Sequence, residues 1–170
     1  MAYCIAIPEV CLVFLVGPSH SGKSSFAQKH FKPSEIVSSD QCRKWISDDE
    51  GNQDCSADAF ALARFIVRKR LKNGKLTVID ATNVKTENRK KFLQLAEQFS
   101  IPVVAFVFDL PVSLCLRRNN GRVPEQTIEI QHGQLQRSLH HLKVSENFSP
   151  LVIFKTIKDI DDILIIRQSS

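Results

Sequence analysis

Short apolar runs alternate along the chain with longer segments in which apolar residues recur at helical spacing. Strands that alternate with helices are typical of a parallel sheet covered on both faces, so we expect an α/β fold with a central sheet of about five parallel strands. The apolar runs predict strands over residues 10–16, 35–38, 76–80, 103–108 and 151–155. The helical spacing predicts helices over residues 23–30, 40–47, 56–72, 86–99, 111–118, 125–142 and 159–165.

Composition limits the class of protein to which the chain belongs. Its 170 residues, 43% of them hydrophobic, suit one domain with a sizeable buried core. The longest apolar stretches are about six residues, far short of the ~20 that would span a membrane, and no basic, apolar leader is present. The five cysteines contain no C-x-x-C pair, so we expect reduced thiols rather than a disulfide framework or zinc site. We expect a soluble, cytoplasmic protein with no membrane partner.

The formal net charge of +5 is compatible with a polyanionic ligand but does not require one. Three basic clusters carry more information than the total. We interpret the first two as solvated helix faces, because their apolar neighbours recur at helical spacing, and the third as a candidate lid. They hold, in chain order, Arg64, Arg68, Lys69, Arg70, Lys72 and Lys75; then Lys85, Arg89, Lys90 and Lys91; then Arg117, Arg118 and Arg122.

Residues 17–24 read Gly-Pro-Ser-His-Ser-Gly-Lys-Ser and fit the phosphate-loop pattern G-x-x-x-x-G-K-[ST] directly after the first predicted strand. Glycines let such a loop turn its amide groups inward around an anion, and the following helix dipole adds to that field. Lys23 would reach the β- and γ-phosphates, and Ser24 would offer a hydroxyl to Mg²⁺. The predicted nucleotide-binding residues here are Gly17, Pro18, Ser19, His20, Ser21, Gly22, Lys23, Ser24 and Ser25.

A carboxylate and an arginine follow the second predicted strand. Their three-residue spacing places Asp40 and Arg43 on one face of a helix, beside the phosphate loop in a parallel sheet. Asp40 could accept the proton of an acceptor hydroxyl, and Arg43 could hold an acidic group of that substrate. Spacing alone leaves a second interpretation open, in which Asp40 only caps the helix and Arg43 lies on the surface.

Two further features complete the candidate site. The run Thr77 to Asp80 resembles a Walker B strand, and we expect Asp80 to act on a metal ion through water. Asn119-Asn120-Gly121 forms an irregular break between two predicted helices, which suits a lid whose arginines, Arg118 and Arg122, stabilise charge on the transferring group. A solvated charged turn is the alternative interpretation of this segment.

Four segments together resemble the 5′-OH polynucleotide kinase module of the bacterial polynucleotide kinase-phosphatase that repairs RNA, and the similarity spans nearly all of the chain. The resemblance implies a P-loop kinase fold with a helical lid, and transfer of the γ-phosphoryl group of ATP or another NTP to a 5′-OH end of RNA or DNA, assisted by Mg²⁺ or Mn²⁺. The segments read GPSHSGKSSFAQKHF, IVSSDQCRKWISDDE, LTVIDATNV and CLRRNNGRVPEQ.

Matching positions carry the implied roles. Lys23 and Ser24 would bind the donor phosphates and the metal, Asp40 would be the general base, and Arg43 would clamp the phosphate 3′ to the accepting nucleoside. The lid residues Arg118, Arg122 and Gln126 would engage the donor nucleotide. His20 stands where this loop commonly has glycine, so a positive φ at that position would strain its backbone.

The resemblance also implies that residues 1–170 are the N-terminal kinase module of a longer enzyme with phosphatase and ligase modules, associated with an RNA 3′-terminal ribose methyltransferase. Two other functions remain open from the residues. One is a P-loop kinase of a small metabolite or nucleoside, and the other is a nucleotide-dependent binding module or switch. Asp40 weighs against a pure switch, which needs no base to activate an acceptor.

Overall fold

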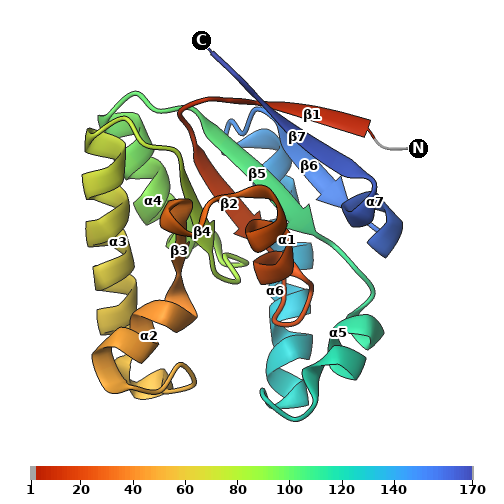
Figure 1. Ribbon diagram of the computed structural model, residues 1–170. Helices are drawn as coiled ribbons and strands as arrows, with labels where there is room; N and C mark the ends of the chain where they lie inside the picture. The colour runs from red at the N-terminus through yellow and green to blue at the C-terminus, as the bar shows by residue number, and fades with distance from the viewer. Residues whose placement is uncertain (1–2, 170) are drawn as a thin grey trace.

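The computed structural model describes residues 3–169. A five-stranded sheet, all parallel, forms the centre of the molecule (Figure 1). This arrangement confirms the predicted α/β fold, because each parallel strand is reached by a helical crossover. Across the sheet the strands are β3 (Ile36–Ser38), β4 (Thr77–Asp80), β2 (Leu12–Val16), β5 (Val103–Phe108) and β6 (Leu151–Phe154).

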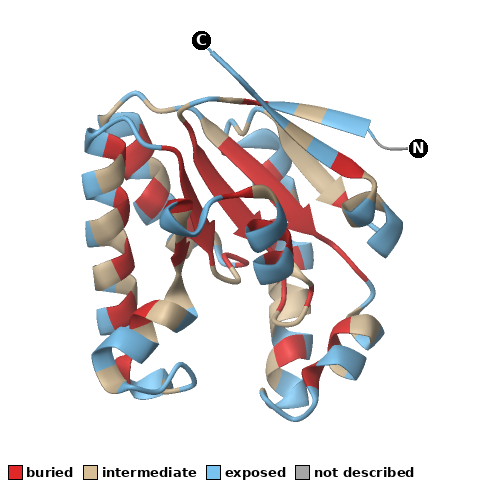
Figure 2. Ribbon diagram, in the orientation of Figure 1, coloured by how far each residue is buried: buried red, intermediate tan, exposed pale blue. Residues whose placement is uncertain are grey.

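The alternation of side chains along β2 divides the interior into two cores. Leu12, Phe14 and Val16 pack with α3 (Ser56–Lys72), α4 (Thr86–Gln98) and α6 (Glu125–Val144) on one face of the sheet, while Val13 and Leu15 pack with α1 (Lys23–His30) on the other. Figure 2 shows the resulting buried sheet between helices whose outer faces are exposed. The other helices are α2 (Ser39–Ser47), α5 (Val112–Asn119) and α7 (Ile157–Asp161).

One part of the sequence prediction is wrong. The helix expected over residues 159–165 is the short α7 followed by a strand, β7 (Ile163–Gln168), and an unpredicted strand, β1 (Tyr3–Pro8), pairs with β7 in parallel. Ile7 and Ile163 are buried against the α1 face of the central sheet, so this second, two-stranded sheet extends that core. The first and last strands of the described chain therefore lie side by side (Figure 1).

Candidate active site

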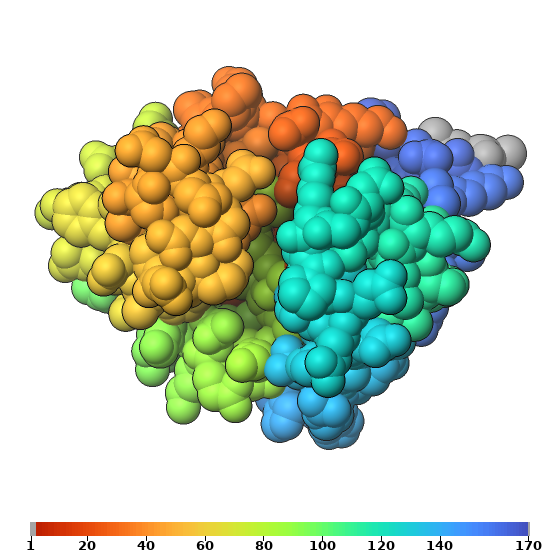
Figure 3. All heavy atoms as spheres, turned by 90° about the horizontal axis from the view of Figure 1, so that it is seen from below, coloured from red at the N-terminus to blue at the C-terminus, as the bar shows by residue number. Residues whose placement is uncertain are grey.

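Three strand ends meet at the carboxyl edge of the central sheet. Ser38 of β3 and Leu15 of β2 both pair with Asp80 at the end of β4. The phosphate loop follows β2, α2 follows β3, and the lid, made of α5, the break at residues 120–124 and the start of α6, comes after β5. Figure 3 looks onto this edge and shows a groove between α2 and the lid. Topology thus gathers the predicted functional segments around one groove.

Close packing explains the first glycine of the phosphate loop. A Cβ atom at Gly17 would lie 2.9 Å from both Phe108 Cβ and Ser21 Oγ, so a larger residue would displace the loop. The Gly17 amide donates to the Thr82 carbonyl oxygen at 2.8 Å, which ties the loop to the segment after β4. Gly22, with φ at 100°, turns the chain into α1 in a conformation that disfavours other residues.

Lys23 is buried at the base of the loop. Its Nζ donates to the Pro18 carbonyl oxygen at 2.6 Å and to Ser21 Oγ at 3.4 Å, so the ammonium group is held under the loop. Burial lowers the pKa of Lys23 to about 8, and the nearby charges of Asp80 and Asp40 partly oppose that effect. The side chain is placed to meet a polyphosphate that enters the loop.

The residues expected to hold a metal ion lie together. Ser24 is exposed, and its hydroxyl lies close enough to the buried Asp80 carboxylate to lower the pKa of that group. Burial raises the pKa of Asp80, while Ser24 and the Lys23 charge lower it. A hydroxyl and a carboxylate beside a phosphate loop are oxygen ligands of the kind that Mg²⁺ prefers, so this pair fits the implied cation.

The backbone of His20 has the positive φ that was expected to strain a residue other than glycine at this position of the loop. Its φ is 63°, in the left-handed region that side chains other than glycine rarely occupy. Within residues 3–169 its Nε2 atom is buried without a hydrogen-bond partner. Burial and the charges of Arg122 and Lys23 lower the pKa of His20, whereas Asp40 and contact with the Asn119 side chain raise it. The ring therefore lies between the phosphate loop, the lid and α2.

Asp40 and Arg43 form an ion pair on α2. The N-cap of α2 is Ser38, whose hydroxyl accepts from the Gln41 amide, so the interpretation of Asp40 as a helix cap is wrong. The Arg43 side chain is only 14% exposed and its Nε donates to the Glu50 carbonyl oxygen at 2.6 Å, which also excludes a free surface arginine. Asp40, 62% exposed, is free to meet a substrate in the groove.

The lid arginines approach the loop to different degrees. Arg118 Nη1 lies 3.6 Å from the position that a Cβ of Gly22 would occupy, directly against the phosphate loop. Arg122 lies near enough to His20 for its charge to lower the pKa of that ring, and Gln126 is exposed on the first turn of α6. The buried Asn119 shapes the break between the helices, because its side chain exchanges hydrogen bonds with the Val123 backbone at 2.6 and 2.9 Å.

Sequence reasoning missed two residues that support the site. Gln131 of α6 accepts a hydrogen bond from the Ser19 amide at 2.8 Å and so connects the lid helix to the phosphate loop. Arg89, predicted to lie on a solvated helix face, is fully buried and pairs with Glu146 at 2.6 and 2.7 Å. It also donates to the Asn83 carbonyl oxygen at 2.6 Å. The sequence pattern of a helix does not distinguish an arginine on the solvated face from an arginine buried in an ion pair.

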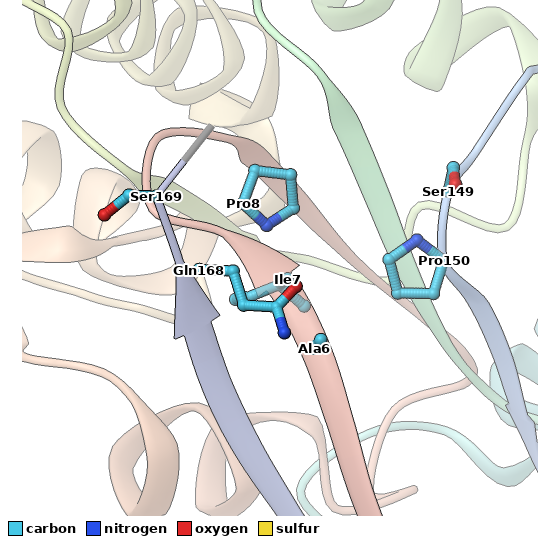
Figure 4. Close-up of a pocket in the computed structure, with 7 residues that line it drawn as sticks. All are labelled: Ala6, Ile7, Pro8, Ser149, Pro150, Gln168 and Ser169. Atoms are coloured by element: carbon cyan, nitrogen blue, oxygen red, sulfur yellow. The ribbon is translucent and has the colours of Figure 1, made fainter.

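A second hollow, of about 300 Å³, lies at the opposite edge of the sheet, where β6 begins and β1 and β7 end (Figure 4). No charged side chain is among the seven residues that line it. It therefore lacks charged groups that bind phosphate, and the candidate active site remains the groove at the carboxyl edge.

Of the helices in residues 3–169, none has the length and apolar character needed to cross a bilayer.

A phosphate loop after the central strand, with a helical lid after β5, defines the class of P-loop kinases. The chain belongs to the AAA_33 family, described as an AAA domain, which matches residues 12–144. Family and fold together identify a P-loop kinase-type phosphotransferase, a class that takes its phosphoryl group from a nucleoside triphosphate.

Individual relatives confirm the resemblance to polynucleotide kinases. A bifunctional polynucleotide phosphatase/kinase of Schizosaccharomyces pombe is 29% identical over 157 residues, 89% of this chain and 35% of that protein. A 26% identical chain in the structure of the Pnkp1/Rnl/Hen1 RNA repair complex aligns with a TM-score of 0.67 over 79% of this chain and 46% of its own. This chain thus spans less than half the length of either relative.

Two further matches have names that indicate other functions. The transcription factor bHLH140 of Arabidopsis thaliana is 27% identical over 158 residues, 89% of this chain and 16% of that protein. A gluconokinase from Sinorhizobium meliloti 1021 is 16% identical, with a TM-score of 0.58 over 92% of this chain and 88% of its own. At that identity the likeness shows the fold alone, so the acceptor has to be argued from the groove.

Proposed function

We propose that this domain transfers the γ-phosphoryl group of a nucleoside triphosphate to the 5′-hydroxyl end of RNA or DNA. The observation that carries the proposal is the Asp40–Arg43 pair, which lies on α2 across the groove from the phosphate loop and within electrostatic reach of Lys23. A carboxylate paired with an arginine suits an acceptor that presents a hydroxyl next to an anion. A 5′-terminal nucleotide has this chemistry, since its 5′-hydroxyl and its 3′-phosphate share one sugar.

In the proposed reaction Asp40 accepts the proton of the 5′-hydroxyl while the 5′-oxygen forms a bond to the γ-phosphorus. The bond between the γ-phosphorus and the bridging oxygen breaks, and a nucleoside diphosphate leaves. Arg43 holds the 3′-phosphate of the accepting nucleotide and keeps the hydroxyl near Asp40. Lys23, Arg118 and Arg122 stabilise negative charge on the transferring group.

The donor site follows the phosphate loop, with residues 17–25 around the phosphates of ATP or another NTP and with Gln126 and the lid arginines over the nucleotide. Ser24 and, through water, Asp80 would hold Mg²⁺ or Mn²⁺. Such a cation, when bound, neutralises charge on the phosphate oxygens. The exposed Ser24 hydroxyl and the buried Asp80 carboxylate are the pair that supports this assignment.

The Asp40→Asn variant tests the assignment of the base. The amide keeps the size of the side chain but cannot accept a proton, so we expect kcat with a 5′-OH oligonucleotide to fall about 10² to 10⁴-fold. The dissociation constant of a non-hydrolysable NTP analogue should stay within about twofold, because Asp40 lies on the acceptor side. Asp58→Asn, at an exposed position of α3, is the matched control. Unchanged turnover in Asp40→Asn would eliminate Asp40 as the base.

We further propose that residues 1–170 form a kinase domain that acts beside phosphatase, ligase and RNA 3′-terminal ribose methyltransferase activities in end repair. Support comes from the names of two relatives, the bifunctional polynucleotide phosphatase/kinase and the Pnkp1/Rnl/Hen1 RNA repair complex. Sealing would then require the 5′-phosphate that this domain makes. RNA with a 5′-OH end should be joined by a 5′-phosphate-dependent ligase only after incubation with the domain and an NTP; joining without it would contradict this order.

A further inference from the structure

A hollow of about 480 Å³ lies between two segments that adjoin the candidate active site. One wall is the segment that leads from β4 into α4, and the other is the middle of α6. In Figure 3 these two segments, light green and blue, meet at the lower end of the groove. The polar residues lining the hollow are Lys85, Thr86, Glu87, Gln134, Arg137, Ser138 and His141.

Each wall of the hollow belongs to a segment that contacts the phosphate loop elsewhere along its length. The Thr82 carbonyl oxygen accepts from the Gly17 amide, and Lys85 follows three residues later. On α6, Gln131 contacts the Ser19 amide, and Gln134 and Arg137, farther along the same helix, line the hollow. At 1.5 Å per residue, these positions lie about 4.5 and 9 Å farther along the helix axis. The hollow therefore lies farther along α6 from the lid than the contact of this helix with the phosphate loop.

The walls are held together by a buried ion pair. Arg89 of α4 pairs with Glu146, which follows α6, and its Nη2 also donates to Thr86 Oγ1 at 3.3 Å. Both charged side chains are at least nine-tenths buried. Since each wall is connected to this pair, the hollow is formed before a ligand enters, and the ordering cost of binding is small.

The charges of the hollow favour an anion. Lys85 and Arg137 are exposed, and neither takes part in an ion pair among residues 3–169, while Glu87 contributes one opposing charge. Arg137 Nη1 lies 3.4 Å from the position that a Cβ of Gly133 would occupy, so the guanidinium lies one turn back along α6, toward the N-terminal end of the helix. No Phe, Tyr or Trp side chain lines the hollow, and the only ring there is that of His141, so the charged lining favours contact with a backbone over base stacking.

We propose that this hollow binds backbone phosphates of the acceptor strand on the 3′ side of the phosphate assigned to Arg43, with Lys85 and Arg137 as the phosphate contacts. The inference rests on the proposed function, because only a polynucleotide acceptor has such phosphates. It assigns the domain a preference for acceptors several nucleotides long, without sequence specificity.

The test compares a 5′-OH ten-nucleotide strand with a nucleoside 3′-phosphate as acceptors for the wild type and the double variant Lys85→Ala, Arg137→Ala. We expect the ratio of kcat/KM for the long acceptor over the short acceptor to fall about tenfold in the variant. The salt dependence of log kcat/KM for the long strand should weaken by about 1.4, since each phosphate contact to a single strand contributes about 0.7. Lys90→Ala, Lys143→Ala is the matched control, with exposed lysines on the same helices outside the hollow.

Neutral linkages identify the ligand directly. Replacing the phosphates beyond the first linkage by methylphosphonates should reduce wild-type kcat/KM to the level of the double variant, and it should reduce the variant no further. Equal losses for short and long acceptors, or independent losses from the variant and the neutral linkages, would overturn the inference while leaving the kinase assignment intact. Failure of the wild type to phosphorylate any 5′-OH strand would instead overturn the proposed function, and the inference with it.

Discussion

The left-handed conformation of His20 predicts an unusual order of stability at one position of the phosphate loop. With φ at 63°, a Cβ atom at this position crowds the backbone at a cost of about 1–2 kcal/mol. His20→Ala removes the ring but retains the Cβ atom, whereas His20→Gly removes both. Glycine loses more backbone entropy on folding, by about 0.5–1 kcal/mol. We therefore expect His20→Gly to be more stable than His20→Ala by about 1 kcal/mol.

Urea denaturation of both variants measures this difference directly, and in a domain of this length it corresponds to about 2–4 °C in Tm. Gln28→Ala and Gln28→Gly provide the control, because Gln28 is exposed within α1 and has helical backbone geometry. There the order should reverse, with alanine more stable by about 1 kcal/mol. If His20→Ala proves at least as stable as His20→Gly, the loop does not hold His20 in a strained conformation.

Three further predictions follow from charged groups at the site and beneath it. Because the pKa of Lys23 is lowered to about 8, the free protein loses this charge above that pH, and the dissociation constant of a non-hydrolysable NTP analogue should rise up to tenfold per pH unit above 8; calorimetry that finds a flat profile to pH 10 would refute this. The same shift makes the free energy of unfolding increase between about pH 8 and 10.5, as the buried ammonium is neutralised; Lys23→Met should remove that increase. Glu146→Ala leaves Arg89 buried and unpaired, so urea denaturation should show a loss of about 3–5 kcal/mol that Arg89→Met partly restores in the double variant; additive losses would contradict this coupling.

The central sheet and the helices around it could be predicted because the signals for them lie in short segments of the sequence. The phosphate loop, the buried strand that ends at Asp80 and the break after Asn119 each combine a periodic segment with a turn or motif. The parallel direction of the strands then followed from their alternation with helices, whereas the order of the strands in the sheet was not predicted. The β1–β7 pair had no such signal, since it joins the two ends of the described chain. A short apolar run such as that of β7 does not distinguish a strand from a helix.

The sequence indicated which residues would form the candidate site, but it did not predict the surroundings of each side chain. Asp40 and Arg43 were recognised by their spacing, and the structure then showed that Ser38, rather than Asp40, caps α2. Burial of Arg89 depends on Glu146, which is 57 residues away, and no periodicity reports such a partner. The contact of Gln131 with the phosphate loop is likewise a tertiary event. Sequence therefore identified the groups that carry charge, whereas their distances and burial required the fold.

The acceptor is the central claim, and a single labelling experiment tests it most directly. The domain is incubated with γ-labelled NTP and Mg²⁺ together with 5′-OH RNA, 5′-OH DNA, a nucleoside and gluconate in separate reactions, with Asp40→Ala as the inactive control. The account predicts label on the 5′ ends of RNA or DNA, and loss of that label in Asp40→Ala. Label found only on the nucleoside or on gluconate, or label on strands that persists in Asp40→Ala, would contradict it.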